Sequence, residues 1–396
     1  MFESLEAAPP DAILGLNEAF AQDPNPAKIN LSVGVYKDSD GKTPVLEVVK
    51  QAERQLLESE TTKSYLGIGG DATYAKLVQN LLFAADDPIL TQQRAATIHA
   101  PGGTGALRVA ADFVRTNCPN AQVWCSNPTW ANHQSIFQAA GLNCQTYAYL
   151  DAPNNCIDFE ALIAALHTAA AGDVVLLHGC CHNPSGVDPT IEQWQEIASV
   201  INERKLLPLV DFAYQGFGDG LEEDAAGLRT IASQVPEFLV ASSFSKNFGL
   251  YRERVGALTF VGPNQSIAQA VLSHIKKAIR ANYSNPPAHG GLIVQTILAD
   301  ANLTTQWHGE LAAMRQRIHD MRSQFVEKMA SVQRDRDFSF IRNQRGMFSF
   351  SGLNPEQVQR LRNEHSIYIV GSGRINVAGI TAKNIDTLCN AIVSVL

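Results

Sequence analysis

The sequence has no long hydrophobic run and little basic charge, and each shortage excludes a class of protein. No apolar stretch in the 396 residues approaches the length of a membrane span, so we expect no membrane partner. Lys and Arg number 31 against 39 Asp and Glu, which gives a net charge of −8. This balance disfavours a nucleic-acid partner, because basic surfaces hold phosphate backbones. A few arginines in a cleft can still bind small anionic substrates.

The cysteines follow no recognisable pattern. The seven lie scattered between Cys118 and Cys389, and no spacing among them matches a zinc site, so we expect no metal centre. The amino terminus has no basic segment before Lys28 and is not expected to be a secretory signal or a transit peptide. Free thiols and the missing leader together predict a cytoplasmic location.

The middle of the chain alternates apolar strands with amphipathic helices, which is typical of a mostly parallel α/β sheet. The predicted strands have continuous apolar cores, as strands covered on both faces should, and begin near residues 121, 172, 206 and 237. We predict one long helix over residues 292–328 and a smaller α+β unit over 337–396. The segment "KINLSVGVYKD" predicts a strand apart from the central sheet, so the two chain ends could pack together.

Polar residues follow these strands, where α/β sheets bind their ligands. They are Lys246, Asp211 and nearby Tyr214, Asn183 and Trp130. A lysine that loses its proton can attack an aldehyde, and an ionised aspartate can keep a pyridine nitrogen protonated. Hydroxyl and amide groups can hydrogen-bond a phenolate oxygen, and a tryptophan can stack on a ring. Each residue alone is more often an ordinary one, but their joint occurrence indicates a single site.

A phosphate site is predicted beside them. The glycine-rich run from Gly102 to Gly105 precedes a probable helix, whose N-terminus and backbone N–H groups attract an anion. Arg254, Ser243 and Ser245 would complete this site. The glycine run alone is a weak signal, and no nucleophile-elbow motif is present.

Several long motifs resemble the aspartate and aromatic aminotransferases of fold type I, in their enterobacterial-like subgroup. These motifs are "HGCCHNPSG", "DFAYQGF", "SSFSKNFGLYRERVG" and "ANYSNPP", and the similarity extends from "LGLNEAF" to "SGRINVAG". The resemblance implies a large domain with a mostly parallel seven-stranded sheet and a smaller α/β domain built from both chain ends. It places an exchanged arm at residues 1–13, the small domain at 14–43 and 314–396, and the large domain at 44–313.

The resemblance also implies a role for each candidate residue toward pyridoxal 5'-phosphate. Lys246 would form the Schiff base and move the substrate proton, and Asp211 would pair with the pyridinium nitrogen, backed by His133 and His178. Tyr214 and Asn183 would bond the phenolate oxygen, and Trp130 would stack on the ring. The implied phosphate ligands are Gly103, Thr104, Ser243, Ser245, Arg254 and the neighbouring subunit's residue at position 65, Tyr65.

For the substrate, the resemblance implies two arginines. Arg374 would bind the α-carboxylate as a fork, Arg280 would come from the neighbouring subunit to bind a second carboxylate, and Gly34 would line the site. Because Tyr65 and Arg280 would serve the other subunit, a homodimer with shared active sites is expected. Cis peptides are expected at Asn127-Pro128 and Asn183-Pro184.

The expected reaction is a ping-pong exchange between amino acids and 2-oxo acids, in which L-aspartate and 2-oxoglutarate give oxaloacetate and L-glutamate. Five positions match the aspartate branch, namely Val35, Lys37, Thr43, Thr104 and Asn285, whereas Ser64 departs from it. An aromatic aminotransferase with dual specificity is the alternative.

A decarboxylase or β-lyase would not need two carboxylate-binding arginines. A non-catalytic effector domain would normally accompany a DNA-binding domain, for which the chain has no room.

Overall fold

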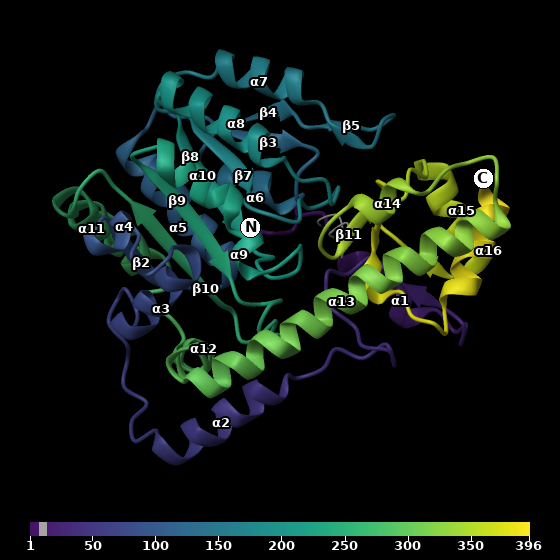
Figure 1. Ribbon diagram of the computed structural model, residues 1–396, viewed down its shortest axis with the longest axis horizontal. Coiled ribbons are helices and arrows are strands. Elements are labelled where there is room, and N and C mark those ends of the chain that lie inside the picture. Colours follow the sequence, from purple (N-terminus) through teal and green to yellow (C-terminus); the bar gives the residue numbers. More distant parts are fainter. Residues whose placement is uncertain (8–13) are drawn as a thin grey trace.

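A seven-stranded sheet forms the centre of the molecule in the computed structural model, which describes residues 1–7 and 14–396 (Figure 1). The strand order is β2-β10-β9-β8-β7-β3-β4. In chain order the strands are β2 (Ala95–Pro101), β3 (Val123–Asn127), β4 (Cys144–Ala148), β7 (Val174–His178), β8 (Leu207–Phe212), β9 (Phe238–Ser243) and β10 (Val255–Val261). Only β10 runs antiparallel to its neighbours in this sheet, which confirms the predicted mostly parallel seven-stranded sheet.

Helices cover both faces of this sheet, which explains why its strands are apolar throughout. Successive residues of β7 pack on opposite sides: Val175 and Leu177 join one buried cluster, and Val174 and Leu176 join the other. Helices α5 (Gly102–Asn117), α6 (Asn132–Ala139) and α11 (Gln265–Asn282) cover one face. Helices α7 (Phe159–Thr168), α8 (Ile191–Arg204) and α10 (Ala226–Gln234) lie on the other.

Helix α8 shows how local sequence fixes these elements. Thr190 accepts a hydrogen bond from the backbone N–H of Gln193, whose side chain bonds the N–H of Thr190 in return, so a capping box starts the helix. Trp194, Ile197 and Ile201 then recur at helical spacing and are buried. The helix ends at Lys205, which adopts a left-handed conformation.

The single long helix predicted over residues 292–328 is two helices. Helix α12 (Ala288–Ala299) ends before Asp300, and α13 (Ala301–Val332) begins after it. Asp300 has extended φ and ψ angles of −109° and 122°, and its carboxylate accepts from the N–H groups of Asn302 and Leu303. An aspartate in this position caps a new helix and interrupts the old one. No helix of the described residues is long and apolar enough to cross a membrane.

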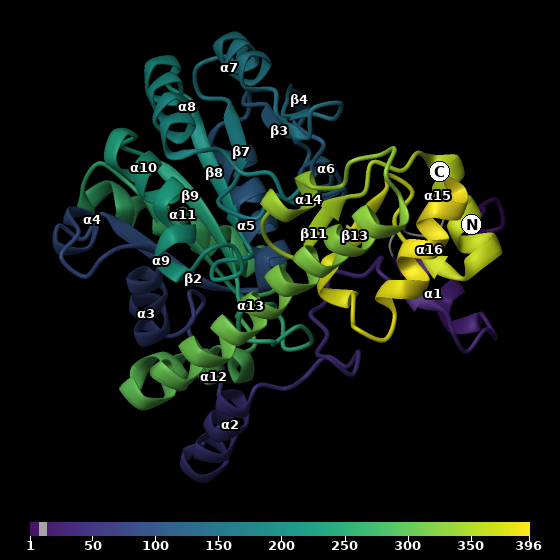
Figure 2. The same cartoon turned by 45° about the vertical axis from the view of Figure 1, so that its right-hand side comes forward.

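The two ends of the chain meet beside the sheet (Figures 1 and 2). Strand β1 (Ile29–Asn30) pairs in parallel with β12 (Ile367–Tyr368), and the Phe20 ring of α1 (Leu14–Gln22) lies 5.5 Å from the Tyr368 ring. The remaining elements of this region are α14 (Phe340–Asn343), β11 (Phe348–Phe350), α15 (Pro355–His365), β13 (Arg374–Asn376), the short 3-10 helix η1 (Val377–Gly379) and α16 (Ile385–Val395). The predicted strand near residue 29 and the carboxy-terminal α+β unit are therefore confirmed.

The exact domain limits stay predictions. The limit at residues 313/314 falls inside the continuous helix α13, which connects the sheet region with the carboxy-terminal region. The predicted exchanged arm, residues 1–13, lies partly outside the described residues, since these omit 8–13.

Candidate active site

A cavity of about 530 Å³ lies where the parallel strands end. Because β7, β8 and β9 are parallel neighbours, Asp211 on β8 sits directly between His178 and Ala241 in the sheet register. Most of the residues predicted for the site line this one cavity. They are Gly34, Gly103, Thr104, Trp130, Asn183, Asp211, Tyr214, Ser243, Ser245, Lys246, Arg254 and Arg374.

Lys246 follows β9 and carries its amine into this cavity. Its Nζ lies 4.6 Å from the centre of the Tyr214 ring. Burial lowers the pKa of Lys246 to about 8, although Asp211 opposes that shift and Arg254 adds to it. A substantial fraction of the amine is therefore uncharged near neutral pH and available as a nucleophile or a base.

Asp211 is held ionised by a buried chain of hydrogen bonds. His133 Nε2 lies 2.9 Å from Asp211 Oδ2, and Thr129 Oγ1 lies 2.8 Å from His133 Nδ1 and 3.1 Å from His178 Nε2. An ionised carboxylate only accepts, so Nε2–H of His133 donates to it, Thr129 donates to Nδ1, and His178 donates to Thr129. Burial alone would raise the pKa of Asp211, but its hydrogen bond from His133 and the nearby charge of Lys246 bring that pKa below its ordinary value.

His178 behaves as a neutral group. Burial, together with His133, lowers the pKa of His178 to about 3, so this imidazole is uncharged at physiological pH. His133 and His178 do not line the cavity; both lie behind Asp211, in contact with each other at 5.2 Å between ring centres. The resemblance implied that both histidines back Asp211, and their role toward a cofactor stays a prediction.

A cradle of donors surrounds the start of α5. The helix begins at Gly102 itself, so the glycine run is its first turn and does not precede it as predicted. Gly102 has a φ of +73°, and a Cβ there would come 2.7 Å from Arg254 Nη2. Ser243 Oγ lies 3.2 Å from Ser245 Oγ, which in turn accepts from Arg254 Nη1 at 3.5 Å. A helix N-terminus, two hydroxyls and a guanidinium in one place suit a phosphate.

Arg374 comes to the same cavity from β13. Its Nη1 donates to Asn183 Oδ1 at 3.2 Å and its Nη2 to the carbonyl of Ser32 at 2.6 Å. Its Nε is buried and has no hydrogen-bond partner among the described residues. Burial lowers the pKa of Arg374 to about 10, so the guanidinium stays charged at neutral pH. A buried, partly unpaired guanidinium suits a carboxylate ligand.

Six residues that line the cavity were not predicted from the sequence, and two of them, Phe348 and Tyr251, make specific contacts there; the other four are Leu107, Ala131, Asn132 and Ala213. The Phe348 ring lies 4.2 Å from Arg374 Cζ, and a Cβ at Gly34 would come 2.7 Å from Phe348 Cζ. The hydroxyl of Tyr251 accepts from the backbone N–H of Tyr36 at 2.9 Å and ties the turn after Lys246 to the amino-terminal region. Phe348 lies in the alternating segment "GMFSF", and Tyr251 lies in the motif "SSFSKNFGLYRERVG". Neither pattern indicates that the residue belongs to a functional site.

Tyr65 and Arg280 do not line this cavity. Tyr65 is 93% exposed, and Arg280 is exposed at the end of α11, where its side chain bonds Ser284. Both predicted cis peptides, Asn127-Pro128 and Asn183-Pro184, are present.

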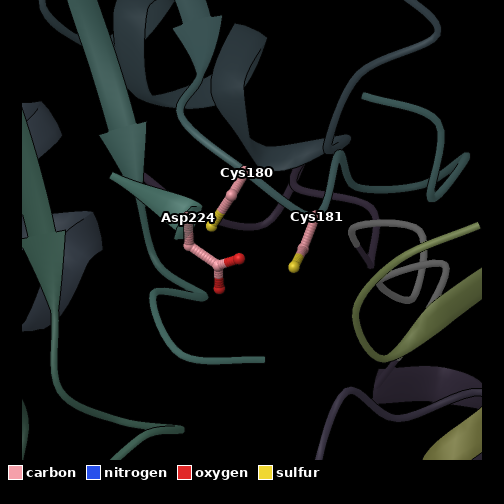
Figure 3. Close-up of side chains that lie close together, drawn as sticks. All are labelled: Cys180, Cys181 and Asp224. Atoms are coloured by element: carbon pink, nitrogen blue, oxygen red, sulfur yellow. The ribbon is translucent and has the colours of Figure 1, made fainter. Parts of the chain in front are cut away.

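A second cluster of reactive side chains lies away from the cavity (Figure 3). Cys180, Cys181 and Asp224 are buried with their ligand atoms within 4.8 Å of one another. Burial raises the pKa of both thiols, which keeps them protonated and poor metal ligands. One oxygen of Asp224 already accepts from the N–H groups of Gly216 and Gly218, at 2.8 and 2.9 Å. The carboxylate therefore fixes the neighbouring turn.

Comparisons with known proteins match this chain to aminotransferases over nearly its whole length. The family model described as "Aminotransferase class I and II" matches residues 26–392. The aspartate aminotransferase of Salmonella typhi is 58% identical over 396 residues and covers all of both chains. The aromatic-amino-acid aminotransferase of Pseudomonas aeruginosa is 48% identical, covering 100% of this chain and 98% of its own. The crystal structure of an aromatic-amino-acid aminotransferase from Burkholderia pseudomallei, covalently bound to pyridoxal phosphate, superposes with a TM-score of 0.98 at 48% identity, covering 100% and 99% of the two chains.

Proposed function

The chain belongs to the class I and II aminotransferase family, and from that premise we propose that it is a pyridoxal-phosphate-dependent aspartate aminotransferase. It transfers the amino group of L-aspartate to 2-oxoglutarate in two half-reactions and yields oxaloacetate and L-glutamate. The higher identity to relatives named for aspartate, 58% against 48% for one named for aromatic amino acids, supports this choice of substrate.

The cavity fits pyridoxal phosphate by the chemistry of its donors. The absence of a side chain at Gly102 lets the Arg254 guanidinium approach the start of α5, and a phosphate beside them would have Gly103, Thr104, Ser243 and Ser245 as further ligands. Tyr65 of a second subunit completes this set in the proposal. The cofactor supplies an aldehyde that bonds to amines and a ring that withdraws electrons from the α-carbon of the substrate.

Lys246 would hold the cofactor covalently through its amine. The same amine, partly uncharged near neutral pH, would serve as the base for the α-proton of the amino acid. Asp211 keeps the ring nitrogen protonated, because its carboxylate stays ionised through His133. Tyr214 and Asn183 bond the phenolate oxygen, and Trp130 covers one ring face.

Two arginines select the substrate in this proposal. Arg374 binds the α-carboxylate with its free Nε–H and one further N–H, while Gly34 lines the cavity and leaves room for the Phe348 ring. Arg280 of a second subunit binds the carboxylate of the side chain. The proposed homodimer rests on the exposure of Arg280 and Tyr65, which cannot serve a ligand within their own chain from those positions. We also propose a cytoplasmic location, in keeping with seven free cysteines.

The observation that carries the proposal is that Lys246 and Asp211 line one cavity together with Arg374, whose Nε–H has no partner in the part of the chain that the structure describes. The test is steady-state formation of oxaloacetate from L-aspartate and 2-oxoglutarate by the purified holoenzyme. Turnover that requires both substrates and follows ping-pong kinetics supports the proposal. No oxaloacetate from the wild-type holoenzyme contradicts it.

An aromatic aminotransferase with dual specificity is the second candidate. The observation in its favour is Ser64, which departs from the aspartate branch and is exposed on the loop that also carries Tyr65. If Ser64 widens the substrate range, L-phenylalanine will react at a rate comparable to that of L-aspartate. Replacing Ser64 by Asn will then reduce the reaction of L-phenylalanine more than that of L-aspartate.

A further inference from the structure

Arg322 is a buried charge outside the site described so far. It lies on α13, is 1% exposed, and has no carboxylate within 4 Å of its guanidinium among the described residues. Burial lowers the pKa of Arg322 to about 9, so it remains a cation at neutral pH. An unpaired buried charge is costly unless other polar groups solvate it. The polar groups that surround the Arg322 guanidinium therefore offset the cost of burying its charge.

The groups around this guanidinium belong to one short segment, residues 341–349. Nη2 donates to the carbonyls of Gly346 and Phe348, each at 2.7 Å, and more weakly to that of Arg345 at 3.4 Å. Nη1 donates to the carbonyl of Ile341 at 3.1 Å and to the Ser349 hydroxyl. The segment is thus wrapped around the charge, and the planar fork fixes several of its carbonyls at once.

Phe348 belongs to this segment and lines the cavity. The Phe348 ring lies 4.2 Å from Arg374 Cζ and 6.0 Å from the centre of the Tyr214 ring. Phe348 also begins β11, which pairs with the strand of Arg374, so that Phe350 lies opposite Arg374 in the register. The backbone that Arg322 holds therefore includes the strand that pairs with the strand of Arg374. It also carries the Phe348 ring that packs against the Arg374 guanidinium.

The same segment also docks on the loop that presents Asn183. The N–H of Arg345 donates to the carbonyl of Gly186 at 2.7 Å, and a Cβ at Gly186 would come 2.6 Å from the carbonyl oxygen of Phe348. Asn183 in turn accepts from Arg374 at 3.2 Å. The loop of Asn183 thus helps to hold the segment, and Phe348 is the side chain of the segment that packs on the Arg374 guanidinium.

We propose that Arg322 is a positioning residue for the substrate carboxylate site: it fixes Phe348 and thereby orients Arg374. This inference rests on the proposed function, in which Arg374 binds the α-carboxylate. Arg322 touches neither substrate nor cofactor. Its effect falls on substrate binding and not on cofactor binding, because the phosphate cradle and Asp211 belong to the central sheet and α5.

The test replaces Arg322 by Lys, which keeps the charge and loses the fork. The KM values for L-aspartate and for 2-oxoglutarate should both rise about tenfold, since a small misplacement of a binding group is enough for that effect. The kcat value should change less than about threefold, and the dissociation constant for pyridoxal phosphate should stay at the wild-type value. Leu303→Ala, a buried position about 28 Å away along the same helix, is the control: it should lower the melting temperature without altering either KM.

A double-mutant cycle separates positioning from general support. If Arg322 acts through Phe348, adding Arg322→Lys to Phe348→Leu will raise KM no further than Phe348→Leu does alone. Two effects that multiply, or a folded Arg322→Lys variant with wild-type KM values, overturn the inference. Should Arg322→Lys fail to fold, Ser349→Ala removes one acceptor of the guanidinium and should raise both KM values about threefold; unchanged values contradict the inference. A wild-type enzyme that does not saturate with L-aspartate instead refutes the proposed function.

Discussion

Replacing Arg374 by Lys tests the substrate site in the most defined way. The guanidinium uses Nη1 for Asn183 and Nη2 for the carbonyl of Ser32, which leaves Nε–H and two further N–H groups for a carboxylate. Lysine lacks Nε–H and cannot form the two parallel bonds. A hydrogen bond to a charged group contributes about 1.5–3 kcal/mol, so kcat/KM should fall roughly 10- to 100-fold.

The assay compares two amino acids in two variants. Because every amino acid carries an α-carboxylate, Arg374→Lys should lower kcat/KM for L-aspartate and L-phenylalanine by similar factors. Arg280→Lys is the matched control, since its proposed ligand is the second carboxylate, and it should affect L-aspartate alone. If Arg374→Lys impairs L-aspartate but spares L-phenylalanine, the assignment of Arg374 to the α-carboxylate is wrong.

Further predictions concern the cofactor groups and the subunits. Lys246→Ala should abolish measurable turnover, and retained activity would remove Lys246 from the mechanism. Asp211→Ala should lower kcat by at least about a hundredfold, since the charge facing the ring is lost; normal turnover would contradict its role. Because burial lowers the pKa of Lys246 to about 8, the rate of covalent cofactor capture by the apoenzyme should rise with pH, reach half its maximum near pH 8 and level off above it, whereas a rate still climbing at pH 10 would indicate an ordinary lysine. Equal mixtures of Lys246→Ala and Arg280→Ala subunits should recover about a quarter of wild-type activity, because half the dimers then hold one intact site; no recovery would contradict shared sites.

The central sheet and most of the site were predictable because their signals are local. Continuous apolar runs predicted β7 and β8, and polar residues after those runs predicted where Asp211 and Asn183 would meet. The break between α12 and α13 was missed because the apolar spacing continues across Asp300. The aspartate ends the first helix through bonds of its own carboxylate, which periodicity does not register.

Contacts between the two ends of the chain were harder to predict from the sequence. Phe348 reaches Arg374 and Gly34 only after the carboxy-terminal strands pack beside the amino-terminal segment. Arg322 likewise lies in an amphipathic helix where an arginine indicates an exposed face, yet it is buried against the 341–349 segment. Both depend on tertiary packing, for which a single sequence holds no local signal.

The most direct test of the account is a stopped-flow half-reaction of the holoenzyme. The purified protein is mixed separately with L-aspartate and with L-phenylalanine, and the absorbance of the lysine-bound cofactor is followed. The account predicts rapid conversion to the pyridoxamine form with L-aspartate and slow conversion with L-phenylalanine. Comparable rates would contradict an aspartate aminotransferase in favour of dual specificity, and the absence of any absorbance band from bound cofactor would contradict the role of Lys246 itself.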